Sequence, residues 1–138
     1  MLQGGYIIIL HIWKGISWTF VSQTVAAEHL NVYCKMSGLV ESAQESPAPD
    51  DVGYYTPTLD ILWEAFGEDR LVYESNWPVS ERFADYATVQ RIVTEYFSTK
   101  GQEATEKYFW KNAKAAYNWF FTFGICGAYG CTWFRQME

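Results

Sequence analysis

The sequence predicts an α/β protein built on a parallel sheet. Strand-like segments alternate with amphipathic helical segments in the order strand, helix, strand, helix, helix, and glycine or proline marks most of the boundaries. In such a fold, right-handed crossovers bring the loops that carry chemistry to the carboxyl ends of the strands. The chain has 138 residues, which corresponds to one domain or part of one.

The first strand of this series is predicted over residues 31–38, where polar and apolar side chains alternate before Gly38. One face carries Tyr33, Lys35 and Ser37, and the other carries Val32, Cys34 and Met36. The segment that follows, 41–55, is rich in Pro, Ser and acidic residues, which predicts a loop. Its length is typical of a loop with a function.

The first helix is predicted to begin with Thr56 as its N-cap and Pro57 at the first helical position, and to end at Gly67. Its apolar stripe consists of Leu59, Leu62, Trp63 and Phe66. A second strand is predicted over residues 70–76, before Trp77 and a proline. We therefore expect chemistry at the two strand ends, in residues 35–38 and 74–78.

Two more helices complete the pattern. Helical spacing gives one an apolar face and a polar opposite face, and it ends near Gly101. Its apolar face consists of Val89, Ile92, Val93, Tyr96 and Phe97. The last helix is predicted over residues 103–119 and is expected to bury Tyr108, Phe109, Asn112, Ala116 and Trp119.

Charge and cysteine content exclude several function classes. Ten Lys and Arg against 16 Asp and Glu give a net charge of −6, without the basic run that binding to a phosphate backbone requires. Nucleic acid is therefore not an expected partner. The cysteines Cys34, Cys126 and Cys131 are odd in number and lack metal-site spacing, so we interpret them as reduced thiols of a cytoplasmic protein.

Both ends of the chain contain apolar stretches that resemble targeting or membrane segments. The apolar stretch 6–13 is short and no Lys or Arg precedes it, which argues against a secretory signal. Residues 115–134 carry no charge and are long enough to cross a bilayer, but three glycines at every third position oppose a helix there. The composition favours an irregular tail, and a membrane tether through 115–134 stays open as an alternative.

Three segments resemble the amidohydrolase-related (amidohydrolase 2 type) metal-dependent hydrolases, especially the branch with sugar-lactone and pyrone-dicarboxylate lactonases. Residues 31–39 (NVYCKMSGL) resemble the penultimate strand of that family, and 70–79 (RLVYESNWPV) its last strand. Asn112-Ala113 with Tyr117 is similar to its closing helix. The resemblance implies a partial (β/α)₈ TIM barrel that contains only the C-terminal strands and helices.

The resemblance also divides the chain. Residues 25–119 correspond to the C-terminal part of the barrel, 1–24 to an atypical segment with room for one barrel strand, and 120–138 to an aromatic, glycine-rich tail. Residues 9–14 are similar to a strand end of the family that presents an active-site histidine. His11 is then a substrate-binding candidate, and the alternative is a histidine beside an apolar strand with no ligand role.

The chemistry implied by the resemblance is attack of an activated water on the carbonyl of a lactone or amide. A divalent, zinc-like metal belongs to the full-length family, but this chain has only His11 and His29 and lacks the family's His-x-His strand, so we assign no metal ligand. The family's last strand carries a carboxylate that accepts the proton of the water. This chain has Asn76 there, and an amide cannot accept that proton.

The candidate catalytic residues are Lys35, Glu74 and Asn76. Lys35 can orient a substrate carboxylate or polarise a carbonyl, or it can simply pair with Glu74. Ser37 and Trp77 join His11 as candidates for binding substrate, although the Ser37 hydroxyl is also suited to forming a turn. The predicted function is hydrolysis of a small lactone or amide, and the alternative is a non-catalytic module that associates with itself through open sheet edges.

Overall fold

A computed structural model describes the backbone of residues 6–11 and the backbone and side chains of residues 28–43 and 45–117. Its sheet has three strands in the order β1 (Tyr6–His11), β2 (Val32–Ser37) and β3 (Leu71–Tyr73). Both strand pairs are parallel, with Cys34 opposite Leu71 and Ser37 opposite His11. The α/β class and the parallel sheet are therefore confirmed.

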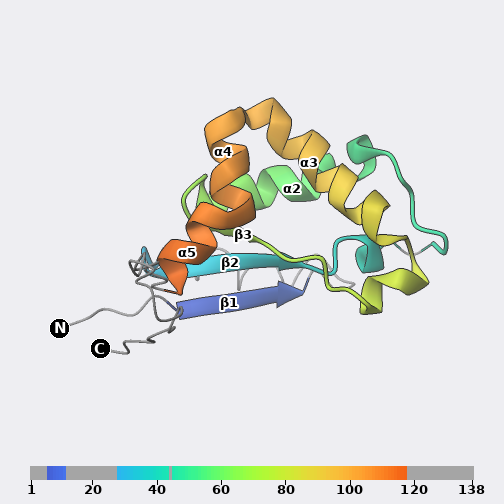
Figure 1. The fold of residues 1–138 in the computed structure, drawn as a ribbon, viewed down its shortest axis with the longest axis horizontal. Coiled ribbons are helices and arrows are strands. Elements are labelled where there is room, and N and C mark those ends of the chain that lie inside the picture. The colour runs from blue at the N-terminus through green and yellow to red at the C-terminus, as the bar shows by residue number, and fades with distance from the viewer. Residues whose placement is uncertain (1–5, 12–27, 44, 118–138) are drawn as a thin grey trace, which may run out of the picture.

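The described helices lie together on one side of the sheet (Figure 1). They are α2 (Val52–Phe66), α3 (Tyr86–Lys100), α4 (Gln102–Glu106) and α5 (Asn112–Ala116), with a π-helical turn, η3 (Lys107–Lys111), between the last two. Short 3-10 turns follow the strands, η1 (Val40–Ser42) after β2 and η2 (Val79–Arg82) after β3. No helix in the described ranges is long and apolar enough to cross a membrane, and most of the segment 115–134 lies outside those ranges.

The core lies between the sheet and the helices. From β2 it takes Val32, Cys34 and Met36, the face predicted to be apolar, and these pack with buried residues of all the longer helices. Alternation along the strand directs Lys35 and Ser37 to the opposite face. Val72 of β3 is the register partner of Lys35. Lys35, Ser37 and Val72 therefore lie on this second face of the sheet, near the carboxyl ends of β2 and β3.

The predicted start of the first helix is wrong. Helix α2 begins at Val52 and has Pro57 inside it, although proline removes a backbone donor from a helix interior. Tyr55 accounts for the earlier start: its ring is buried in the core and its hydroxyl donates to the Pro49 carbonyl at 2.7 Å. Burial of this ring requires helical geometry one turn before the proline. The N-cap and proline signals in the sequence do not show which rings are buried, so they do not predict the earlier start.

The predicted second strand and last helix differ from the observed elements. Strand β3 ends at Tyr73 rather than at residue 76, and Asn76 itself has a positive φ of 55° that extended backbone does not allow. The predicted helix 103–119 is instead divided into α4, η3 and α5, and it buries Tyr108, Asn112 and Ala116 while Phe109 is half-buried. Trp119 lies outside the described residues.

A polar contact joins α2 to α3 and predicts a dependence of stability on pH. Tyr96 and Lys100 donate to Asp60 Oδ1 at 2.7 and 3.2 Å, and the Tyr96 bond and then the Lys100 bond lower the pKa of Asp60 from 3.8. A carboxyl with a lower pKa in the folded state stabilises that state fully above pH 3.8, and the contribution is lost as pH falls through the folded-state pKa. We expect Asp60→Asn to flatten the acid dependence of the free energy of unfolding below about pH 4.

Urea unfolding followed by tryptophan fluorescence between pH 7 and pH 3 measures this dependence. Glu64→Gln on the same helix is the matched control and should keep the slope of the unmodified chain. Parallel curves for the unmodified chain and Asp60→Asn would show that the Asp60 contact does not contribute.

Candidate active site

The carboxyl ends of β2 and β3 bring together two of the three predicted catalytic residues. Lys35 Nζ lies 2.9 Å from Glu74 Oε1, and the two side chains are 22% and 24% exposed. The second carboxylate oxygen, Glu74 Oε2, is buried and has no hydrogen-bond partner among the described residues. The pairing that the sequence left open as an alternative is therefore present, and it fixes a charged pair at the strand ends.

Asn76 lies just beyond this pair and contacts a residue that the sequence analysis did not single out. Its Nδ2 donates to Glu41 Oε1 at 2.7 Å. Glu41 belongs to η1, directly after β2, and its other oxygen, Oε2, is buried without a partner. The loop composition of residues 41–55 does not distinguish Glu41 from the other acidic residues of that segment. No local pattern singles out Glu41, because its partner lies 35 positions away in the sequence.

Two buried serines add to the polar character of this edge. Ser37 and Ser80 are each 0% exposed, and within the described part of the chain neither hydroxyl has a hydrogen-bond partner. The Ser37 hydroxyl thus does not form the turn hydrogen bond considered as an alternative. Six buried side-chain polar atoms lack a partner in the described structure, and four of them belong to the strand-end segments 37–41 and 74–80. Such atoms are rare in proteins and each calls for a physical explanation, such as a bound water, an ion or a catalytic role.

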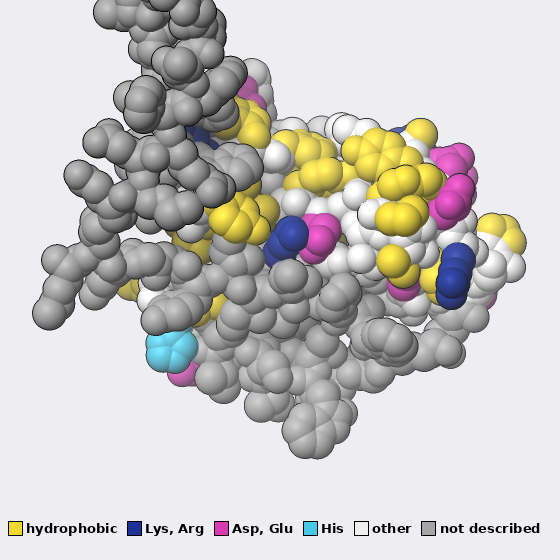
Figure 2. Space-filling view, turned by 60° about the horizontal axis from the view of Figure 1, so that its bottom comes forward, with side chains coloured by type: hydrophobic (Ala, Val, Ile, Leu, Met, Phe, Trp, Pro, Cys, Tyr) yellow, Lys and Arg dark blue, Asp and Glu magenta, His cyan; other side chains and the backbone are white. Residues whose placement is uncertain are grey.

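Trp77 lies at the rim of this region. Its ring is 42% exposed and meets the Tyr86 ring edge-on at 5.9 Å between centroids. Burial and then Tyr86 raise the pKa of Tyr73, whose ring packs against Tyr108 and Phe109 on the helix side. Figure 2 shows one basic and one acidic side chain next to each other on the described surface, with hydrophobic side chains around them. An exposed aromatic beside polar groups suits a substrate with both apolar and polar faces.

Asn112 has a structural role behind the site. Its buried Nδ2 donates to the backbone carbonyls of Glu68 and Leu71 at 2.7 and 2.8 Å. These two hydrogen bonds hold α5 against the start of β3. The Asn-Ala pair that resembles the closing helix of the family therefore stabilises the fold. The side chain of His11 lies outside what the structure describes, although its backbone is the partner of Ser37 in the sheet.

The donors for a metal ion do not converge in the described part of the chain. Within residues 28–43 and 45–117, no three His, Cys, Asp or Glu side chains are grouped closely enough to hold one. Cys34 is buried on the helix side, and burial raises the pKa of its thiol to about 12, so it is a neutral thiol at neutral pH. The described residues therefore do not fit a metal by themselves.

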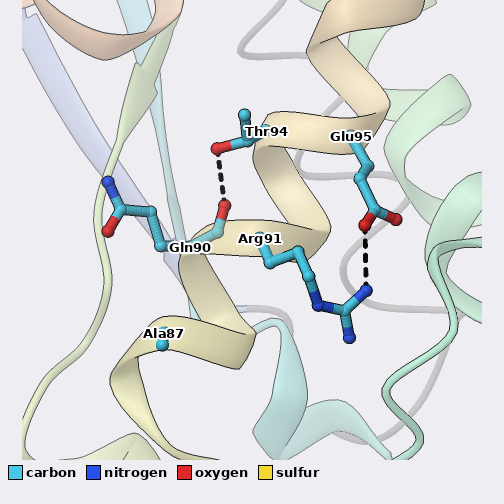
Figure 3. Close-up of a pocket in the computed structure, with 5 residues that line it drawn as sticks. All are labelled: Ala87, Gln90, Arg91, Thr94 and Glu95. Carbon is cyan, nitrogen blue, oxygen red and sulfur yellow. Dashed lines mark hydrogen bonds and ion pairs between the residues drawn. The ribbon is translucent and has the colours of Figure 1, made fainter.

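A hollow elsewhere on the molecule has a different character. It lies on the outer side of α3 and is lined by Ala87, Gln90, Arg91, Thr94 and Glu95 (Figure 3). Arg91 pairs with Glu95 at 3.0 Å and Thr94 donates to the Gln90 carbonyl at 2.7 Å. These contacts are of the kind found on a solvated helix face, and none of the strand-end residues reaches this hollow.

The fold and the polar strand ends define an α/β protein with its candidate chemistry at the carboxyl ends of parallel strands. The chain belongs to the amidohydrolase family, because the model of that family matches residues 7–119. It is also similar to solved structures of amidohydrolases. One from Burkholderia multivorans, solved with bound Hepes and again with bound zinc, has a TM-score of 0.65 and 27% identity over 72% of this chain and 36% of that one.

Other relatives agree with this assignment. An amidohydrolase 2 structure from Bifidobacterium longum subsp. infantis has a TM-score of 0.59 and 25% identity, covering 83% of this chain and 40% of that one. An L-fucono-1,5-lactonase from Burkholderia multivorans is 31% identical over 62% of this chain, and one from Burkholderia ambifaria is 38% identical over 48%. The chain spans only 29% and 23% of the lengths of these two lactonases.

Proposed function

We propose that this chain is a hydrolase that opens a lactone, or cleaves an amide, by attack of an activated water at the ends of β2 and β3. The observation that carries the proposal is the Lys35–Glu74 pair, which lies where parallel α/β folds keep their chemistry, in a chain similar to two lactonases. A sugar 1,5-lactone is the substrate class that the names of these relatives suggest. In the complete architecture, the described strands and helices correspond to the C-terminal part of a (β/α)₈ barrel.

Lys35 is proposed to act on the carbonyl oxygen. Negative charge develops on this oxygen when water adds to an ester, and a donor already aimed at it stabilises the transition state. Glu74 holds the Lys35 ammonium at 2.9 Å, so the lysine is oriented before substrate arrives. Trp77, Ser37 and His11 are the proposed substrate-binding residues. A metal is known from the zinc-containing structure of a relative, but the residues described here do not fit one, so no step is assigned to it.

Lactone hydrolysis by the purified chain tests this proposal, since each turnover releases an acid that a pH indicator detects. We expect a rate above that of the buffer, and Lys35→Met should lower kcat/KM by roughly 100-fold because one carbonyl donor is lost. Lys114→Met, at an exposed position of α5, is the matched control and should keep the full rate. A folded chain no faster than buffer, or a Lys35→Met variant as fast as the unmodified chain, would contradict the proposal.

A second candidate function is a non-catalytic module that associates with itself. The observation that favours it is the sheet order, because within the described residues the outer edges of β1 and β3 pair with no further strand. Light scattering after size-exclusion chromatography separates the two candidates. A dimer without lactone turnover supports the module, and turnover by a monomer rejects it.

A further inference from the structure

Opening a lactone with water requires a residue that accepts a proton from the water, and Lys35, which acts on the carbonyl oxygen, does not supply one. Water is a weak nucleophile until one of its protons is taken by a positioned base. Asn76 cannot serve, because an amide side chain does not accept a proton at neutral pH. Two carboxylates with a buried oxygen that lacks a partner lie at the described strand ends, those of Glu41 and Glu74.

The partners of these two carboxylates distinguish them. Glu74 is held by the Lys35 ammonium at 2.9 Å, so taking up a proton would forfeit the attraction of an ion pair. Glu41 is held by the neutral amide of Asn76 at 2.7 Å, and protonation of its free oxygen Oε2 costs no ion pair with that partner. Of the two carboxylates, Glu41 is the one whose hydrogen-bond partner carries no charge.

Glu41 is also held in place from both sides. Its turn, η1, is anchored by the buried side chains of Leu39, Val40 and Ala43. On the other side, Asn76 adopts a positive φ of 55°, and its carbonyl accepts a hydrogen bond from the Ser80 amide at 3.2 Å. Asn is one of the few residues besides glycine that adopt this left-handed conformation readily, and here it forms the turn between β3 and η2. The carboxylate of Glu41 is thus positioned before any substrate binds.

Tyr55 is a titratable group whose pKa is affected by the charge of Glu41. Burial, then Tyr54, then Glu41 raise the pKa of Tyr55 to about 12. Tyr55 therefore remains a neutral phenol at neutral pH, and its hydroxyl is already committed to the Pro49 carbonyl at 2.7 Å. It does not compete with Glu41 for the proton of the water.

We propose that Glu41 is the general base of this site, an inference that rests on the proposed function and adds a catalytic residue to it. Glu41 Oε2 takes one proton from water as the water oxygen forms a bond to the carbonyl carbon of the lactone. The carbonyl π electrons move onto the carbonyl oxygen and return when the ring C–O bond breaks. The leaving alkoxide then takes the proton from Glu41. The product is a hydroxy acid, and the carboxylate of Glu41 is ionised again.

Glu41→Gln tests this role with little change in shape. Gln retains an oxygen that accepts the hydrogen bond from Asn76, but it cannot take a proton. We expect kcat for a sugar 1,5-lactone to fall by about 100-fold or more, while the melting temperature stays within about 2 °C of the unmodified chain. Glu45→Gln, at an exposed position in the following loop, is the matched control and should keep the full rate.

Glu41→Ala with added formate provides a readout that a purely structural role would not move. The cavity left by the side chain admits a small carboxylate, so formate should raise the rate of Glu41→Ala but not that of Glu41→Gln. Lactone turnover that depends on Lys35 but survives Glu41→Gln would overturn this inference and leave the proposed function intact. Absence of turnover in the unmodified chain would instead overturn the proposed function, and the role of Glu41 with it.

Discussion

Replacing Phe97 with alanine should lower the free energy of unfolding by about 3–5 kcal/mol, the largest stability effect expected in this chain. Phe97 is 1% exposed and stacks on the Tyr108 ring with 3.7 Å between centroids and 11° between planes. Its ring also meets Trp63 and Tyr96 edge-on, at 6.1 and 5.2 Å. Alanine would remove three ring contacts and leave a cavity between α3 and η3 that the surrounding rings cannot fill.

Urea denaturation monitored by circular dichroism measures the Phe97 effect. Trp110→Ala is the matched control, because this aromatic residue of η3 is 52% exposed, and its loss should cost no more than about 0.5 kcal/mol. Equal losses of stability in Phe97→Ala and Trp110→Ala would mean that the rings around Phe97 do not form the core.

Asn112→Asp should cost about 2–4 kcal/mol, because it replaces the donor of two buried hydrogen bonds with a charged acceptor. The backbone carbonyls of Glu68 and Leu71 would each lose their bond from Asn112 Nδ2 and face a carboxylate instead. Loss of this tie should also loosen the start of β3. Hydrogen exchange of the β3 amides should therefore accelerate in Asn112→Asp more than exchange in the middle of α3.

Gln90→Glu is the control for the Asn112 substitution, since it makes the same chemical change at an exposed position of α3. It should alter stability by no more than about 0.5 kcal/mol. If Asn112→Asp is equally mild, the amide does not hold α5 to the sheet.

Local patterns predicted the elements whose signals lie close together in the sequence. Helix α3 appears as expected because its apolar spacing, its Asp85 N-cap with the Thr88 amide at 2.7 Å and its glycine end are all encoded within one segment. The alternation of β2 is likewise local. The start of α2 was missed because it depends on the burial of Tyr55, which is a property of the assembled core.

The candidate site was predictable only in part, for the same reason. Lys35 and Glu74 could be expected to meet, because parallel strands bring their carboxyl ends to one edge of the sheet. The contact between Asn76 and Glu41 joins residues 35 positions apart through a turn and a residue with positive φ. Neither feature follows from periodicity or composition. Glu41 is a candidate catalytic residue only because the fold places its carboxylate within hydrogen-bond distance of Asn76.

We propose that the ends of β2 and β3 line one binding site, and mapping a bound ligand onto the chain tests this placement. Amide chemical shifts can be recorded by NMR while the hydroxy acid released from a sugar 1,5-lactone is titrated into the isotope-labelled chain. We expect the shift changes to concentrate in residues 35–41 and 74–80 and to diminish in Lys35→Met. Shifts confined to the outer side of α3, or no saturable shifts at all, would contradict it.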